Sequence, residues 1–268
     1  SKDEIYSVIL SEICNPSVFQ LNPLNAVFWG DKQKNERFLG TIFGLSEALL
    51  KANEHRRKYL SFEKQKIEEV YNGAKQSSGT ANMGFNPIEL TTEIDGFFVQ
   101  IKSGLDQLAR SLNPLFGFRF DAWHKAKNPK SRMEESGFGI LSSLENNLPK
   151  NKKDKSERLL ELLRSNIGWL SYLVFLRDNP VHRGGAKNIT QIIFERGKGV
   201  VIPQRIMHGE GKIEDVGPFL TRTIYEVIGF FSGFLLLSME LAGAGLVLLK
   251  TQNGYGWGIP NNPDKANN

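Results

Sequence analysis

One short segment, residues 175–185, holds more chemically reactive side chains than any other part of the sequence. It contains two arginines, an acid, an amide and a histidine: Arg177, Arg183, Asp178, Asn179 and His182. Arginine offers a fixed cationic fork for phosphate, and histidine is the side chain that titrates near neutral pH. This combination indicates chemistry on a phosphodiester.

A helix is expected to lead into this segment. Residues 154–157 form a capping box, and apolar residues then recur at every third or fourth position: Leu159, Leu163, Ile167, Leu170 and Val174. Three residues later comes Arg177, so we expect it on the core-facing side of the helix. A buried guanidinium without partners is costly, so Arg177 must face a cleft, a partner chain or a carboxylate. Neighbouring helical residues do not face each other, which argues against Asp178 as that carboxylate.

Pro180 allows the chain to turn between the arginine and the histidine. In an unbroken helix, His182 would lie roughly 140° around the axis from Arg177. Proline disfavours helical geometry at Asn179 and removes one backbone amide. We therefore expect the two side chains to be able to reach a common site.

Other segments also show helical periodicity. Apolar residues at Phe38, Ile42, Leu45 and Leu49 predict a helix from about residue 35, which could continue through Tyr71. After a Gly- and Ser-rich connection at 72–85, an Asn-Pro-Ile-Glu sequence at 86–89 predicts a second helix that ends at Asn113-Pro114. A short helix is expected at 139–148, and a long apolar helix after residue 215.

The period changes to that of strands after Gly185. Residues 189–194 and 200–202 flank a glycine turn, which predicts a β-hairpin at about 189–202. We therefore expect a mainly α fold with a small β-hairpin insertion. The expected organisation is an N-terminal extension (1–35), a helical domain (36–250) and a flexible tail (251–268).

Composition is that of a folded protein with a moderate positive charge. The 268 residues carry a formal net charge of +5, and residues 119–158 account for most of it, with ten Lys or Arg against six Asp or Glu. The single cysteine, Cys14, excludes an internal disulfide and suits a reducing cytosol, and the first residues do not resemble a signal peptide. We expect a cytoplasmic protein. The other histidines lack ligand spacing, so neither a metal site nor a cofactor is expected.

Aromatic residues stand next to this basic region: Phe116, Phe118, Phe120 and Trp123. Aromatic rings beside lysines can bind RNA by stacking and phosphate contact. More often such rings anchor a loop to the core while the charges remain in water, and we favour that interpretation. In either case the lysines would attract a polyanion, and the candidates for RNA contact are Lys125, Lys127, Lys152 and Lys153.

The apolar stretch 227–249 is long enough to span a bilayer, with Glu240 as its only charge. An internal acid, several glycines and little flanking positive charge argue against insertion. We expect a helix buried on several sides or at a dimer interface. A membrane-anchored protein remains the alternative.

The Arg177-Asp178 pair, its spacer and His182 resemble the motif of the HEPN superfamily. The earlier helix, with Phe97-Phe98 and residues 103–106 (Ser-Gly-Leu-Asp), is similar to that family's other long helix, and the resemblance covers about residues 50–245. It implies an up-and-down helical bundle. It also implies a metal-independent endoribonuclease with a composite site at a homodimer interface, in which Arg177 and His182 are catalytic and Asp178 supports them. Such proteins act as toxins or antiviral defence effectors, so an antitoxin or regulatory protein is a further expected partner.

Two other functions stay open at this point. Some HEPN branches are not catalytic and bind a nucleotide, RNA or a protein. Arg177, Asp178 and His182 could also form a purely structural polar contact at a helix end. In the nuclease interpretation, Asn179 and Arg183 would contact the RNA beside the catalytic pair.

Overall fold

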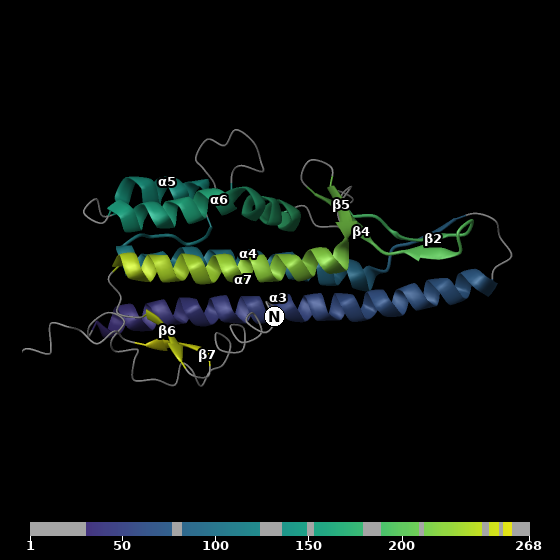
Figure 1. Ribbon diagram of the computed structural model, residues 1–268, viewed down its shortest axis with the longest axis horizontal. Helices are drawn as coiled ribbons and strands as arrows, with labels where there is room; N and C mark the ends of the chain where they lie inside the picture. Colours follow the sequence, from purple (N-terminus) through teal and green to yellow (C-terminus); the bar gives the residue numbers. More distant parts are fainter. Residues whose placement is uncertain are drawn as a thin grey trace, which may run out of the picture. The chain divides into compact units, whose positions relative to one another are not determined.

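The computed structural model describes residues 31–76, 82–123, 136–148, 153–178, 189–208, 212–242, 247–251 and 254–258. Most of these residues lie in five helices (Figure 1): α3 (Lys32–Gln76), α4 (Ile88–Phe116), α5 (Phe138–Asn147), α6 (Lys153–Asp178) and α7 (Val216–Ala242). The strands are short: β1 (Met83–Phe85), β2 (Ile192–Glu195), β3 (Val200–Ile202), β4 (Arg205–His208), β5 (Lys212–Asp215), β6 (Val247–Thr251) and β7 (Gly254–Gly258). The predicted mainly α class and helical bundle are confirmed.

The chain forms two compact units. The first takes its described residues from Ser1–Ala48, Ser103–Tyr172 and Ile228–Asn268, and the second from Leu49–Lys102 and Leu173–Val227. Four of the helices, α3, α4, α6 and α7, contribute residues to both. Each unit is therefore built from separate stretches of sequence. The predicted division into extension, helical domain and tail remains a prediction.

The first unit has an apolar core built on α4, α6 and α7. Residues of the predicted α6 stripe are buried there, and so are leucines of α4: Leu105, Leu108, Leu112, Leu159, Leu163 and Leu170. The ring of Phe230 in α7 packs edge-on against Trp123 and Trp169, with ring centroids 6.3 Å apart in each case. Edge-to-face packing of this kind adds to the energy of burial.

Helix α4 continues past the proline that was expected to stop it. It ends at Phe116, with Pro114 inside its last turn. The side chain of Asn113 then holds the returning chain, because its amide donates to the Phe120 carbonyl and its oxygen accepts from the Phe120 amide, both at 2.7 Å. A proline removes only its own amide bond, so a helix end that is fixed by such contacts tolerates it.

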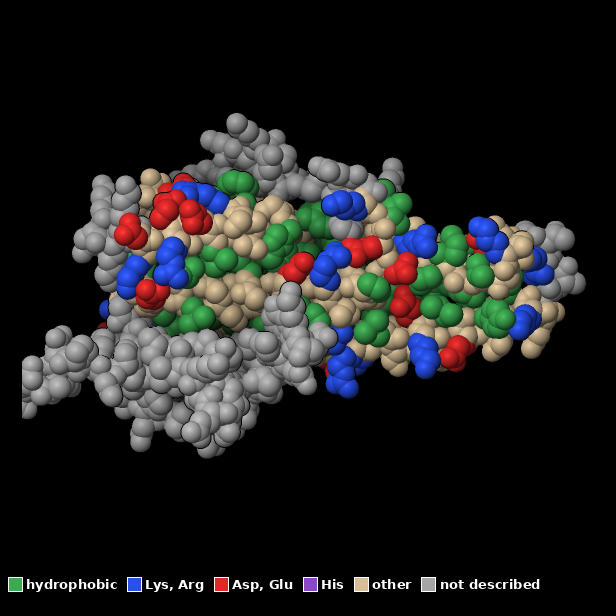
Figure 2. Space-filling view, in the orientation of Figure 1, with side chains coloured by type: hydrophobic (Ala, Val, Ile, Leu, Met, Phe, Trp, Pro, Cys, Tyr) green, Lys and Arg blue, Asp and Glu red, His purple; other side chains and the backbone are tan. Residues whose placement is uncertain are grey.

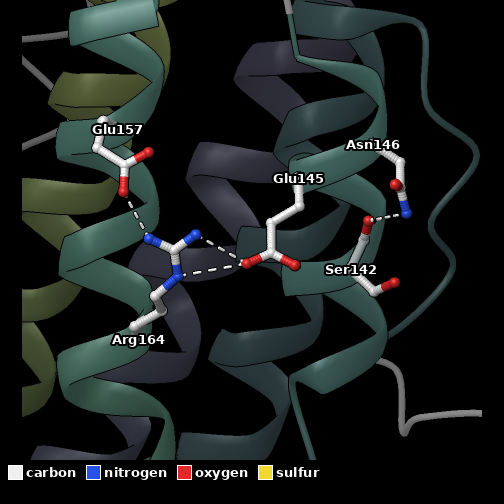
Figure 3. A network of polar contacts seen from close by, with 5 residues as sticks. All are labelled: Ser142, Glu145, Asn146, Glu157 and Arg164. Carbon is white, nitrogen blue, oxygen red and sulfur yellow. Dashed lines mark hydrogen bonds and ion pairs between the residues drawn. The ribbon is translucent and has the colours of Figure 1, made fainter.

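Polar contacts on the surface join α5 to α6 in the first unit. Figure 3 shows Arg164 between two glutamates, with its NH2 2.8 Å from Glu145 and its NH1 2.6 Å from Glu157. Hydrogen bonds to these glutamates raise the pKa of the Arg164 guanidinium. The position of α5 agrees with the helix predicted at 139–148.

The apolar stretch 227–249 does not form one helix. Helix α7 ends at Ala242, and residues from Val247 onward form β6. Glu240 is paired with α6 of the same unit, 3.1 Å from Lys155 and 3.6 Å from Arg158. Two helices, Asp154–Asp178 and Val216–Ala242, are long and apolar enough to cross a membrane, although half of the most apolar window of each is buried inside the protein. Such helices also form the cores of soluble proteins.

The second unit combines helix packing with two small sheets. Ile94, Phe97 and Phe98 of α4 are at most 2% exposed. The predicted hairpin is confirmed, with Ile193 opposite Ile202, and Gly199 in its turn has a φ of 65° that favours glycine.

Three features of the β structure were not predicted. Strand β1 lies in the connection that was expected to be flexible, and it pairs with β2. Strands β4 and β5 form a second hairpin. Strand β7 lies in the tail that was expected to be flexible. Pairing between distant segments supplies the hydrogen bonds of β1, and that information is absent from its three-residue sequence.

A close approach between α3 and α4 in the second unit depends on Gly96. The ring of His55 lies against this glycine, and a Cβ added there would be 2.6 Å from Nδ1 and 2.7 Å from Nε2. Real Cβ atoms do not come so close to other atoms, so any larger residue must displace the imidazole.

We expect Gly96→Ala to lower the free energy of unfolding by about 1–3 kcal/mol, because the added methyl group overpacks this contact. The matched control is Gly229→Ala, since Gly229 lies in α7 and a methyl group added to its Cα would meet open space. That change should stabilise the protein by about 0.5–1 kcal/mol. Chemical denaturation measures both. Adding His55→Ala should reduce the cost of Gly96→Ala, and equal costs in the two backgrounds would contradict the contact.

Candidate functional site at the end of α6

Arg177 lies in the last turn of α6, one turn after the buried Val174. Its side chain is 45% exposed, and of the three surroundings expected for it, a cleft, a partner chain or a carboxylate, it meets a carboxylate. The helical spacing still puts it on the same stripe as Val174. At a helix end, however, a long arginine can keep its guanidinium in water. The positive charge is also favourable at the C-terminal end of a helix dipole.

Asp178 is the carboxylate that pairs with Arg177. Its Oδ1 accepts a hydrogen bond of 2.8 Å from NH1 of the arginine. The expectation that adjacent helical residues would not meet is therefore wrong at this helix end, because the flexible arginine side chain can fold toward its neighbour. Asp178 is the only described residue with which Arg177 forms a hydrogen bond or ion pair. The guanidinium has five N–H donors, so one such bond leaves capacity for a phosphate.

The other predicted site residues are not part of the described structure. Asn179, His182 and Arg183 lie outside it, as do Lys125, Lys127 and Lys152, and Lys153 is described only through its backbone at the start of α6. The approach of His182 to Arg177 stays a prediction. Ile189 is the first described residue after this segment. It forms a β-bridge with Ile206 of β4, and the Thr190 amide donates to the Arg205 carbonyl at 2.8 Å.

Two of the aromatic residues near the basic region are structural anchors. Trp123 is 2% exposed and its amide donates to Asp106 of α4 at 2.7 Å, and Phe120 is 9% exposed. Their faces are therefore covered, which confirms for these two rings the interpretation that they hold a loop to the core. On the face shown in Figure 2, the described Lys and Arg side chains alternate with Asp and Glu and do not gather in one basic patch.

A histidine and a glutamate meet in the second unit, and the sequence did not reveal this pair. His55 Nδ1 lies 2.7 Å from Glu93 Oε2, with the histidine side chain 27% exposed and the glutamate 12% exposed. The two residues are 38 positions apart, so no local spacing could have indicated them. A carboxylate at Nδ1 orients an imidazole and selects its tautomer. The described residues hold no group of three potential metal ligands, so the pair alone does not form a metal site.

Arg56, the next residue after His55, is held in the second unit by neutral partners. Its NH1 donates to Thr221 at 3.2 Å and its Nε donates to Asn53 at 3.0 Å. Burial lowers the pKa of its guanidinium, which nevertheless remains a cation at neutral pH. This arginine is structurally engaged, in contrast to the exposed Arg177.

We expect Arg177→Ala to change the free energy of unfolding by less than about 1 kcal/mol, because exposed ion pairs contribute little. The comparison is Arg222→Ala, which removes two hydrogen bonds to Glu214 and a cation–π contact with Phe219. That variant should lose about 1 kcal/mol or more. Urea denaturation measures both. A loss above about 2 kcal/mol for Arg177→Ala would instead indicate the structural polar contact.

The sequence matches no protein-family model, no curated protein and no solved structure.

The candidate site consists of the exposed Arg177–Asp178 pair and the segment that follows it. His55 and Glu93 form a second set of proton-carrying groups in the same unit.

Proposed function

We propose that this protein is a metal-independent endoribonuclease of the HEPN type. The observation that carries the proposal is the exposed guanidinium of Arg177, paired with Asp178 at the end of α6 directly before the segment that contains His182. A catalytic arginine must be accessible to a phosphate. An arginine buried among structural partners would speak against catalysis, whereas Arg177 is accessible.

The proposed reaction is attack by the RNA 2′-hydroxyl on the adjacent phosphorus. His182 takes the proton from the 2′-oxygen, and Arg177 stabilises the negative charge that grows on the phosphoryl oxygens. The bond from phosphorus to the 5′-oxygen of the next nucleotide breaks, and that oxygen takes up a proton. The products are a 2′,3′-cyclic phosphate and a free 5′-hydroxyl. Asp178 holds the guanidinium in place and reduces its net charge before RNA binds.

The proposal includes a homodimer in which two copies of the motif form one composite site. Arg177 suits such a site because its side chain is exposed at the end of a helix. Asn179 and Arg183 would contact the RNA near the bond that is cleaved, and Lys125, Lys127, Lys152 and Lys153 would bind its phosphates farther away. By resemblance, the enzyme would be a cytoplasmic toxin or antiviral effector with an antitoxin or regulatory protein as partner.

The test is cleavage of a labelled RNA in the presence of EDTA, with analysis of the product ends. The wild-type protein should cleave and leave cyclic phosphates. Arg177→Ala and His182→Ala should each reduce the rate by about 10²–10⁴-fold, because each removes one catalytic group. Arg164→Ala is the matched control, since Arg164 is an exposed, ion-paired arginine of the first unit. It should cleave at the wild-type rate.

Cleavage that persists in the Arg177→Ala, His182→Ala double variant contradicts the proposed site. Absence of cleavage together with RNA binding would support the non-catalytic module. Replacement of Lys125, Lys127, Lys152 and Lys153 by glutamine should then abolish binding, while His182→Ala should not affect it. These outcomes distinguish the enzyme from the binding protein.

A further inference from the structure

A chain of polar side chains in the second unit is buried at its centre and plays no part in the proposed reaction. It consists of Tyr59 and Glu63 on α3, Gln204 directly before β4, and Asn86 shortly before α4. Tyr59 and Gln204 are completely buried. The Tyr59 hydroxyl lies 2.7 Å from Glu63 Oε1 and 3.4 Å from Gln204 Oε1, and Gln204 Nε2 donates to Asn86 Oδ1 at 3.3 Å.

The number of protons in this chain depends on Glu63. A tyrosine hydroxyl has one proton to donate, but here it faces two acceptor oxygens. If Glu63 is ionised, Tyr59 donates to it across the shorter distance and Gln204 Oε1 receives no proton from the tyrosine. If Glu63 is protonated, it donates to Tyr59, and Tyr59 can donate to Gln204. Only the protonated chain satisfies both oxygens, and unsatisfied buried oxygens destabilise a fold.

The surroundings of Glu63 favour the protonated form. Burial raises the pKa of its carboxyl, and the negative charge of Asp215 adds to this effect, while the hydrogen bond from Tyr59 opposes it. Asp215 is itself paired with Arg205 at 3.1 Å. On the side of α7 the carboxyl faces Gly217, where an added Cβ would lie 3.1 Å from Oε2. The positive end of that helix partly offsets the cost of the charged form.

Gln204 connects this chain to the backbone around β4. The backbone carbonyl of Gln204 accepts a hydrogen bond of 3.0 Å from the backbone amide of Val216, the first residue of α7. Arg205 follows Gln204 in the sequence. Its backbone amide donates to Thr190 Oγ1 at 2.9 Å, and its backbone carbonyl accepts from the Thr190 amide at 2.8 Å. Whatever holds Gln204 in place therefore also holds the start of α7 and the attachment of Thr190.

We infer that Glu63 is a proton-dependent positioning residue, whose protonation completes the chain through Tyr59 to Gln204 and strengthens the attachment of Thr190 and Val216. Since the pKa of Glu63 is raised in the folded state, its protonation adds stability at low pH. That contribution is lost as the pH rises through the folded-state value. Thr190 follows the segment that contains His182, so an effect on RNA cleavage rests on the proposed function, whereas the effect on the backbone does not.

Hydrogen exchange of the Thr190 and Val216 amides tests the inference. In the wild-type protein, protection corrected for intrinsic exchange should increase from a neutral to a mildly acidic pH, by at most tenfold per pH unit for one linked proton. Glu63→Gln supplies a permanent donor, so its protection should be high at both pH values. Tyr59→Phe removes the central hydroxyl and should be weakly protected at both. Glu68→Gln is the matched control, because Glu68 is an exposed glutamate on the same helix, and it should behave as the wild type.

Equal protection at both pH values in the wild-type protein overturns the inference. That result is expected if Gln204 presents Nε2 rather than Oε1 to Tyr59, because the chain is then complete without a proton on Glu63. A pH response that persists in Glu63→Gln also overturns it. RNA cleavage is measured separately over the same pH range, where Glu63→Gln should flatten the profile. Absence of cleavage in every variant contradicts the proposed function and leaves the exchange result to decide the inference.

Discussion

The burial of the apolar side of α4 is the constraint on which the rest of the structure depends. Large side chains along this helix are at most 2% exposed, in the second unit at Ile94, Phe97 and Phe98 and in the first at Leu105, Leu108 and Leu112. Burial of each such side chain contributes about 1.5–3 kcal/mol relative to exposure, so this helix supplies much of the stability of both units. Its glycines serve the same packing, because Gly96 accommodates the His55 ring and Gly104 the Phe231 ring. Its polar residues hold the chain that follows, through Asp106 and Asn113.

Charged residues lie near the ends of α6 and α7, and their partners change the meaning of Arg177. Glu240 near the end of α7 is satisfied by Lys155 and Arg158 on α6. Arg177 at the end of α6 pairs with its own neighbour and remains half exposed. A residue that the periodicity presents as an anomaly in the core is thus an accessible cation. Accessibility is what phosphate chemistry requires, so the corrected position favours the proposed function more than burial would.

Deeper in the second unit, proton-carrying groups occur in pairs. His55 is oriented by Glu93, and Glu63 shares a proton chain with Tyr59 and Gln204. Burial makes the carboxyl group of Glu63 expensive to ionise, so its protonation is coupled to the packing around it. The same unit contains Arg177, which means that the proposed catalytic residue and the proton-dependent groups belong to one compact part of the protein.

The sequence by itself determined the helices and the hairpin at 192–202, because periodicity of apolar residues and turn glycines are local signals. It also identified Trp123 and Phe120 as anchors, since aromatic rings beside a core helix are usually buried. Only the tertiary structure decided the pairing of β1 with β2, the contact of His55 with Glu93 and the chain from Glu63 to Gln204. These contacts join residues that are far apart along the chain, and their formation depends on how the helices pack. The exposure of Arg177 was decided in the same way, because spacing gives the direction of a side chain from its helix but not whether other residues cover it.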